Sequence, residues 1–183
     1  MKKTLFAALL FFAAAAFQES AAQNTDSVSI NMSSDTAAVS FITNATMANL
    51  KEIETGNLAI QKAQNADVKA FGKRMVDDHM KANEELSTIL QDKKFKPSMT
   101  ASPDKHGDML KQASGSDFDK QYMSMMLMDH QKTITLFENA SRNVKDPDIK
   151  AFATKTLPIL QEHLTMAKTI AAKLNVSSPG TGQ

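Results

Sequence analysis

The 183-residue sequence predicts an all-α protein: a four-helix bundle built from two antiparallel helical hairpins. Its composition is helical, with only six glycines, no tryptophan and a single tyrosine. Four long stretches carry apolar residues at steps of three or four, as helices with one buried face do. The segment ADVKAFGKRM at 66–75 also recurs as PDIKAFATKT at 147–156, an offset of 81 residues. This weak internal duplication favours a bundle of two similar hairpins over an open helical array.

The first 22 residues predict an export signal that is absent from the mature protein. Lys2 and Lys3 precede an apolar run at 5–17, and small residues at 20–22 form a cleavage site before Gln23. A retained anchor is the alternative, but the run is shorter than the ~20 residues that a membrane span needs. No later stretch is apolar enough to be a transmembrane segment. We therefore expect an exported protein, periplasmic or associated with the outer membrane.

Composition and charge exclude several classes of function. Cysteine is absent, which excludes disulfides, thiolate metal ligands and a lipid-modified cysteine. The net charge of +1, from 21 basic and 20 acidic residues, argues against a nucleic-acid partner. The sequence shows no nucleophile–base pair, phosphate-binding loop or sugar-cleaving carboxylate pair. We therefore predict no catalytic residues.

The first hairpin is expected to follow a polar, flexible linker at 23–35. Its helices are predicted at 36–63 and 66–93, and Asn65 or Asp67 can cap the second one. The connection to the second hairpin, 94–116, is long, and Ser102-Pro103 can begin a short helix within it.

The second hairpin is predicted from helices at 117–143 and 147–174. Asp146 suits the N-cap of the last helix, and Pro147 suits its first turn. Pro158, inside this helix, is expected to kink it. Residues 175–183 are polar and predict a disordered tail, so the expected bundle spans 36–174.

Three predicted helices each carry a histidine on the apolar face: His79, His130 and His163. At 1.5 Å per residue, each lies roughly 20–24 Å from its hairpin turn, which is mid-height for helices roughly 42 Å long. Glu52 lies at the same height on a face of small residues in the first helix. We expect these four side chains to meet, and they are candidate ligands for one divalent transition metal.

Other polar side chains are predicted to surround these ligands. Asp78, Asp129 and Glu162 each precede a histidine and point about 100° away from it, so they suit outer hydrogen-bond partners. Tyr122 and Glu54 are the remaining candidates, and Glu54 is expected to be buried on the opposite side of its helix from Glu52.

Two alternatives to this metal site stay open. Buried polar groups need partners, and a metal-free network of histidine, glutamate and tyrosine would provide them. The run YMSMMLMDH, 122–130, also places four methionines beside His130, and thioethers bind Cu(I). These four point around the whole helix, so at most two can join the histidine. Methionine is also an ordinary core residue. His106, in the long connection, is expected to be solvated.

Four segments together resemble the bacterial domain-of-unknown-function family 4142, whose members are sometimes labelled "predicted outer membrane protein". They are EIETGNLA (52–59), VKAFGKRMVDDHMKANEEL (68–86), FDKQYMSMMLMDHQKTITLFE (118–138) and IKAFATKTLPILQEHLTMA (149–167). The resemblance implies a ferritin-like four-helix bundle that is exported and has no established activity. The family pattern carries onto Glu52, Asp78, His79, Tyr122, His130, Pro158 and His163.

The sequence departs from ferritin-like di-iron proteins, which use Glu-x-x-His motifs. Val76, Leu127 and Leu160 stand three residues before the histidines, and none is a ligand. One metal at most is therefore expected. The predicted protein is an exported bundle with a central His/Glu cluster, in an envelope or stress-related role implied by family and compartment. The alternatives are a protein that stores iron, zinc, manganese or copper or uses it for redox chemistry, and a module that binds an envelope protein.

Overall fold

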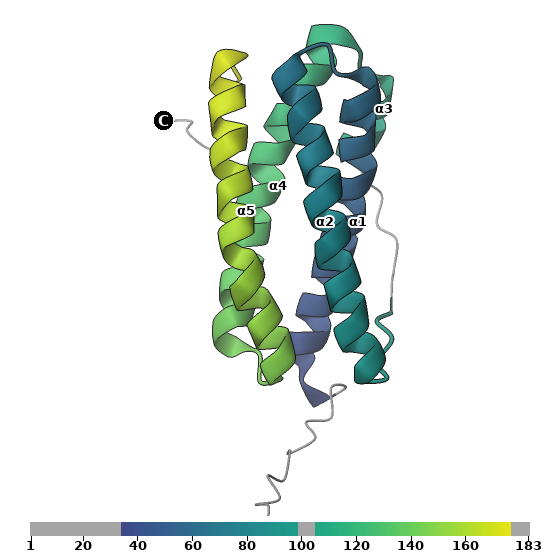
Figure 1. Ribbon diagram of the computed structural model, residues 1–183, viewed down its shortest axis with the longest axis vertical. Helices are drawn as coiled ribbons and strands as arrows, with labels where there is room; N and C mark the ends of the chain where they lie inside the picture. Colours follow the sequence, from purple (N-terminus) through teal and green to yellow (C-terminus); the bar gives the residue numbers. More distant parts are fainter. Residues whose placement is uncertain (1–33, 99–104, 177–183) are drawn as a thin grey trace, which may run out of the picture.

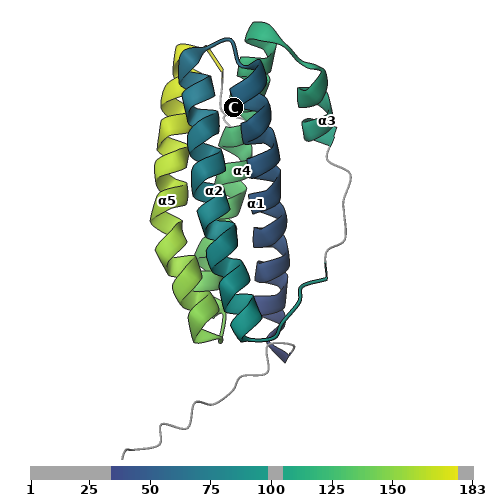
Figure 2. The same ribbon diagram turned by 45° about the vertical axis from the view of Figure 1, so that its right-hand side comes forward.

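The computed structural model describes residues 34–98 and 105–176, and within them the chain is helical. Its elements are α1 Thr36–Lys62, α2 Ala66–Asp92, α3 Lys105–Gln112, α4 Gly115–Asn143 and α5 Pro147–Lys173. Figure 1 shows α1 and α5 running in one direction and α2 and α4 in the other. The short α3 lies outside the bundle beside α1 (Figure 2). The predicted four-helix bundle of two antiparallel hairpins is confirmed.

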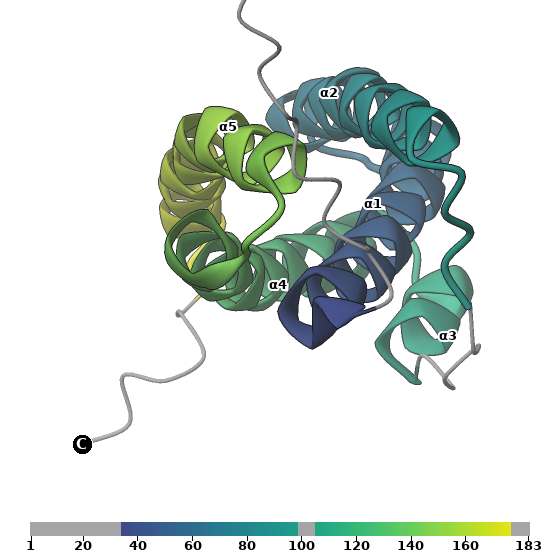
Figure 3. The same ribbon diagram turned by 90° about the horizontal axis from the view of Figure 1, so that it is seen from below.

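The four long helices surround one axis in the order α1, α2, α5, α4, as the view from below shows (Figure 3). The predicted boundaries agree closely, apart from α4, which begins at Gly115 instead of residue 117. Gly115 has a φ of +58°, a left-handed conformation that glycine adopts without strain. α5 continues as a helix through Pro158.

A buried aspartate of each hairpin accepts hydrogen bonds from the turn of the other hairpin. Asp119, on α4, accepts hydrogen bonds from two backbone N–H groups of the α1–α2 turn at 3.1 and 2.8 Å. Asp35 accepts from two N–H groups of the α4–α5 turn at 2.8 and 3.3 Å. Asn65 caps α2 and Asp146 caps α5, as predicted. These bonds satisfy backbone donors that a helix start leaves unpaired, and they fix the relative height of the two hairpins.

The folded domain extends slightly beyond its predicted limits. Asp35 is not part of a flexible linker, because it is buried and accepts a hydrogen bond from the Ala38 N–H at the start of α1. Val176 is not part of a disordered tail, because its N–H donates to the Ala171 carbonyl at 2.9 Å and its side chain packs on the core. The predicted export signal (1–22), residues 23–33 and residues 177–183 lie outside the described residues.

Glycine allows α1 and α2 to approach closely. A Cβ atom on Gly72 would lie 2.6 Å from the Cβ of Ala59, and one on Gly56 would lie 2.9 Å from the Gly72 carbonyl oxygen. Both distances are too short for real atoms, so the crossing needs glycine on both helices. None of the helices in the described ranges is long and apolar enough to span a bilayer.

Two apolar clusters fill the bundle, one at each end. The upper core lies near the α1–α2 turn and contains Ala59, Ala63, Val68, Phe71, Met75, Leu110, Phe118, Tyr122, Met123, Met125, Met126, Leu127, Ala167, Ile170 and Ala171. The lower core contains Ala38, Phe41, Ile42, Ala45, Leu86, Leu90, Phe137, Ala140, Val144, Ile149, Phe152, Ala153 and Leu160. Buried polar side chains lie on the same helices between these two sets, and the candidate site is among them.

Candidate metal centre

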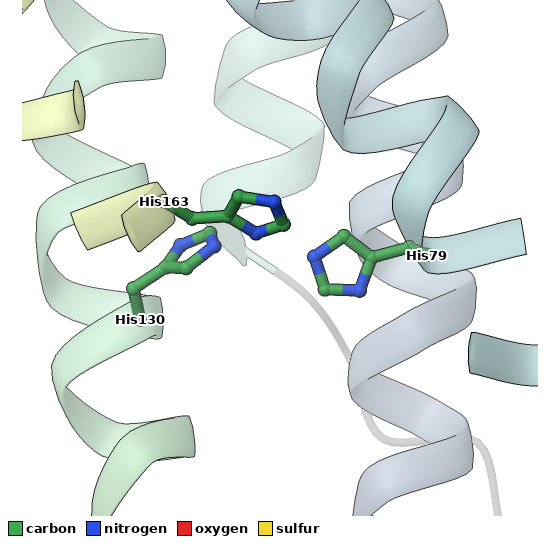
Figure 4. Close-up of side chains that lie close together, drawn as sticks. All are labelled: His79, His130 and His163. Atoms are coloured by element: carbon green, nitrogen blue, oxygen red, sulfur yellow. The ribbon is translucent and has the colours of Figure 1, made fainter. Parts of the chain in front are cut away.

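The three predicted histidines meet in the middle of the bundle. His79 comes from α2, His130 from α4 and His163 from α5, and Figure 4 shows their rings turned toward one another. The ring centroids are 5.9 Å (79–130), 5.6 Å (79–163) and 5.5 Å (130–163) apart. One nitrogen from each ring lies within 4.8 Å of the other two, and each residue is at most 4% exposed. Three helices therefore bring three imidazoles to one point.

One nitrogen of each imidazole forms a hydrogen bond to an atom outside the three-histidine cluster. The Nδ1 of His79 lies 2.9 Å from the Asn49 Oδ1, and the Nδ1 of His130 lies 3.0 Å from the Met126 carbonyl. The Nε2 of His163 lies 3.0 Å from the Asp78 carboxylate. All three partner atoms are acceptors, so in each pair the imidazole nitrogen is the donor.

The tautomers follow from these bonds. A neutral imidazole carries one hydrogen, so a ring that donates outward has a bare lone pair on its second nitrogen. These second nitrogens are the Nε2 of His79, the Nε2 of His130 and the Nδ1 of His163, and none has a hydrogen-bond partner in the protein. Three buried lone pairs thus belong to rings that face one another. Metal-binding histidines show the same pattern of one outward bond and one free nitrogen.

The surroundings keep the three rings neutral. Burial and, to a smaller extent, the neighbouring imidazoles lower the pKa of His79 to about 3. Burial likewise lowers the pKa of His130 to about 4. For His163, burial lowers the pKa while the adjacent Asp78 opposes the shift. Neutral imidazoles can accept a metal ion without first losing a proton, which favours binding at neutral pH.

Asp78 links the centre to the surface of the bundle, as predicted for an outer partner. It accepts hydrogen bonds from His163 and from Arg74, and Arg74 also reaches Glu162 at 3.4 Å. Burial raises the pKa of Asp78, but the bonds from Arg74 and His163 outweigh it and lower the pKa overall. An ionised Asp78 therefore holds the His163 ring with its Nδ1 free. Asp129 differs from the expectation, because its partner is Lys51 at 2.9 Å.

Glu52 is buried beside the histidines but does not belong to the group of converging ring nitrogens. Its Oε1 lies 4.0 Å from the Nδ1 of His130, which is the nitrogen that donates to a backbone carbonyl. Burial, reinforced by the charge of Asp129, raises the pKa of Glu52 to about 8, so the carboxyl group is protonated at pH 7. Tyr122 is fully buried, and its pKa is raised by burial and by Glu52. The Tyr122 hydroxyl and the Glu52 Oε2 have no hydrogen-bond partner in the protein.

Two parts of the predicted surroundings need correction. Glu54 is not buried: its side chain is 59% exposed and forms an ion pair with Lys111 of α3 at 2.8 Å. Asn49 was not predicted, although it is buried and orients His79. An asparagine on an apolar helix face is a weak signal alone, but Asn49 lies one turn from Glu52 on the same face of α1.

Comparison with known proteins places the chain in a family. The family described as "Domain of unknown function (DUF4142)" matches residues 19–170. The chain belongs to this family. The resemblance seen in the sequence is thereby confirmed. No curated protein matches the DUF4142 chain in sequence.

Three solved structures show the same fold at low sequence identity. A DUF305 protein from Streptomyces coelicolor, described as secreted, has a TM-score of 0.69 at 9% identity, covering 78% of this chain and 95% of that one. CopM in the Cu(I)-bound form has a TM-score of 0.64 at 21% identity, covering 74% and 95%. A two-domain protein from Anabaena variabilis with DJ-1/ThiJ/PfpI-like and ferritin-like domains has a TM-score of 0.58 at 18% identity, covering 79% and 39%. The DUF4142 chain is therefore a ferritin-like helical bundle.

Proposed function

We propose that this DUF4142 protein binds one transition-metal ion through His79, His130 and His163. A single observation carries the proposal: three buried, neutral imidazoles each bond outward with one nitrogen and leave the other without a partner in the protein. A buried polar atom without a partner costs about 1–3 kcal/mol. One cation can satisfy three lone pairs at once.

A metal-free network accounts less well for the same atoms. In such a network the histidines would donate to one another or to Glu52 and Tyr122. Instead, their hydrogens go to Asn49, a backbone carbonyl and Asp78, so only acceptors remain on the inward side. The hydroxyl of Tyr122 and one oxygen of the Glu52 carboxyl, Oε2, also lack hydrogen-bond partners in the protein. This arrangement of donors and acceptors supports a ligand set over a hydrogen-bond network.

The ligand chemistry favours Cu(I), with Zn(II) as the second candidate. Imidazole suits zinc, copper, iron and nickel. All three ligands are neutral and Glu52 is protonated at pH 7, so a monovalent ion brings less unbalanced charge into the bundle than a divalent one. Asp78 contributes one negative charge at the edge of the site, partly offset by Arg74. The Cu(I)-bound state of CopM, which shares the fold, supports including copper in the test.

Titration of the purified, metal-free protein tests the proposal. We expect one equivalent of Cu(I), measured against a competing chelator, or of Zn(II) to bind. The variants His79→Gln and His163→Gln should each abolish tight binding, and His106→Gln, which changes the one histidine outside the cluster, should not. Failure of the wild type to bind either ion stoichiometrically would refute the proposal. Binding by His79→Gln and His163→Gln as tight as that of the wild type would also refute it.

We also propose that the protein acts after export, as a metal-holding protein of the cell envelope. The charged start, apolar run and small residues of positions 1–22 support export, and the DUF305 neighbour is described as secreted. The test is fractionation of cells that produce the full chain, followed by N-terminal sequencing. We expect protein outside the inner membrane that begins at Gln23. Full-length protein in the cytoplasm would contradict this.

A further inference from the structure

Methionines occupy only one of the two apolar cores. Met75, Met123, Met125 and Met126 are buried in the upper core, and Met166 packs against it. The members of the lower core include no methionine, and its centre is filled by the rings of Phe41, Phe137 and Phe152. Because the two hairpins are related by duplication, an ordinary use of methionine as core filler would distribute it over both ends. The thioethers lie on one side of the histidines.

Three of these methionines stand in register with the three histidines. Met75 precedes His79 by four residues on α2, and Met126 precedes His130 by four residues on α4. Met166 follows His163 by three residues on α5. Since α5 runs opposite to α2 and α4 (Figure 1), all three lie above the histidines, by roughly 4.5–6 Å of helix rise. Each helix that supplies an imidazole thus carries a thioether one turn above it.

A pocket opens to solvent between α2 and α5, on the same side of the histidines as these methionines and mostly above them. Its volume is about 360 Å³, and it is lined by Phe71, Met166 and Ile170, with Asp67 and Lys173 among its polar wall residues. The Phe71 ring also lies beside the histidine cluster, with its centroid 6.5 Å from that of His130. The pocket is therefore lined by Met166, one of the three methionines above the histidines, and by Phe71, whose ring lies next to that of His130.

We propose that this pocket, with the thioethers of Met75, Met126 and Met166, forms the route by which Cu(I) reaches the histidines. The inference rests on the proposed function and specifies its ion and entry path. Thioethers bind Cu(I) well and hard divalent ions poorly, so the route selects a soft monovalent ion. Methionine side chains are flexible enough to hand an ion from one sulfur to the next. Copper stays Cu(I) throughout, and each new sulfur or nitrogen bond replaces one that is released.

The first experiment compares uptake of Ag(I), a redox-inert probe for Cu(I), with uptake of Zn(II). The variant M75L/M126L/M166L removes the sulfurs and nearly preserves the volume of the core. We expect its Ag(I) uptake to be slower by about tenfold or more, the effect of raising a barrier by about 1.4 kcal/mol, with Zn(II) uptake unchanged. The control M80L/M109L, at positions 46% and 59% exposed, should behave as wild type for both ions.

The second experiment tests the pocket. Thr169→Phe places a ring in the pocket wall, and Lys155→Phe places the same ring on an exposed position of α5 near the lower core. We expect Thr169→Phe to slow uptake of both ions and Lys155→Phe to slow neither. Equal rates in these two variants would refute the pocket as the entry path.

The outcomes separate this inference from the proposed function. Unchanged Ag(I) uptake in M75L/M126L/M166L, or an equal slowing of both ions, would overturn the role of the thioethers while stoichiometric binding at the histidines still stands. Wild-type protein that takes up neither ion would refute both. Ag(I) binding that survives His79→Gln but not the methionine substitutions would uphold the thioether site and overturn the histidine site.

Discussion

Replacing His130 with leucine should stabilise the metal-free protein. The imidazole is 1% exposed, and its Nε2 has no hydrogen-bond partner in the protein. Removing such an atom relieves a penalty of about 1–3 kcal/mol. Little is lost in return, because the Met126 carbonyl that accepts from Nδ1 also belongs to the backbone ladder of α4. Leucine has about the right size for the space. For a domain of this size, the melting temperature should rise by roughly 2–4 °C per kcal/mol.

Metal should reverse the order of the melting temperatures of wild type and His130→Leu. An ion that binds only the folded state stabilises it by about 2.7 kcal/mol at a free concentration 100 times its dissociation constant. The wild type should gain this amount and His130→Leu should gain almost none, because the variant keeps only two of the three ligands. The melting curves of the two proteins should therefore cross over between chelated and metal-saturated conditions.

Differential scanning calorimetry with EDTA and with excess Zn(II) measures both effects. His106→Leu is the matched control. Any difference between its melting temperature and that of the wild type should be the same in EDTA and in Zn(II). If His130→Leu melted well below wild type in EDTA, and by the same margin in Zn(II), the histidines would be a structural network and the reasoning from unpartnered lone pairs would be wrong.

Three further predictions concern the surroundings of the centre. Asp78→Asn should weaken metal affinity by about 10–100-fold, the usual effect of losing the group that orients a ligand, and a competition titration would measure it. The metal-free protein should lose stability as the pH falls below 6.5, because the pKa values of His79 and His130, about 3 and about 4, lie below their value of 6.5 in the unfolded chain. Glu52 acts in the opposite sense: its pKa of about 8 lies above the unfolded value of 4.5, so its contribution to stability falls as the pH rises above 4.5 and is fully lost above about 8. Urea unfolding from pH 4.5 to 8.5 should thus show a maximum near neutrality, and a monotonic rise would contradict it. Gly72→Ala should destabilise the protein by about 1–3 kcal/mol, because its Cβ would lie 2.6 Å from a Cβ of α1; no loss in urea unfolding would contradict the close crossing.

The sequence was sufficient to predict the helices and the meeting of the histidines. Apolar periodicity indicates which face of a helix is buried, and the rise per residue gives the height along it. The sequence alone therefore predicts that His79, His130 and His163 lie at one height. Side-chain direction within the centre could not be predicted. Glu54 and Glu52 are two residues apart, and only the packing of α3 on α1 puts Glu54 with Lys111 at the surface. The orientation of the His79 and His163 rings likewise depends on acceptors from other helices, Asn49 of α1 and Asp78 of α2.

The repeat offset pairs one imidazole of the centre with the amide of Asn49. Subtracting the offset of 81 residues from His130 gives position 49, where α1 carries Asn49, and both side chains are buried. In one hairpin this position supplies a proposed ligand, while in the other it supplies the amide oxygen that accepts from the Nδ1 of His79. Asn49→His would therefore not simply add a fourth ligand. It would remove the acceptor that fixes the His79 tautomer, and with it the lone pair on Nε2. The difference between the two hairpins at this position is thus a condition for the proposed ligand set.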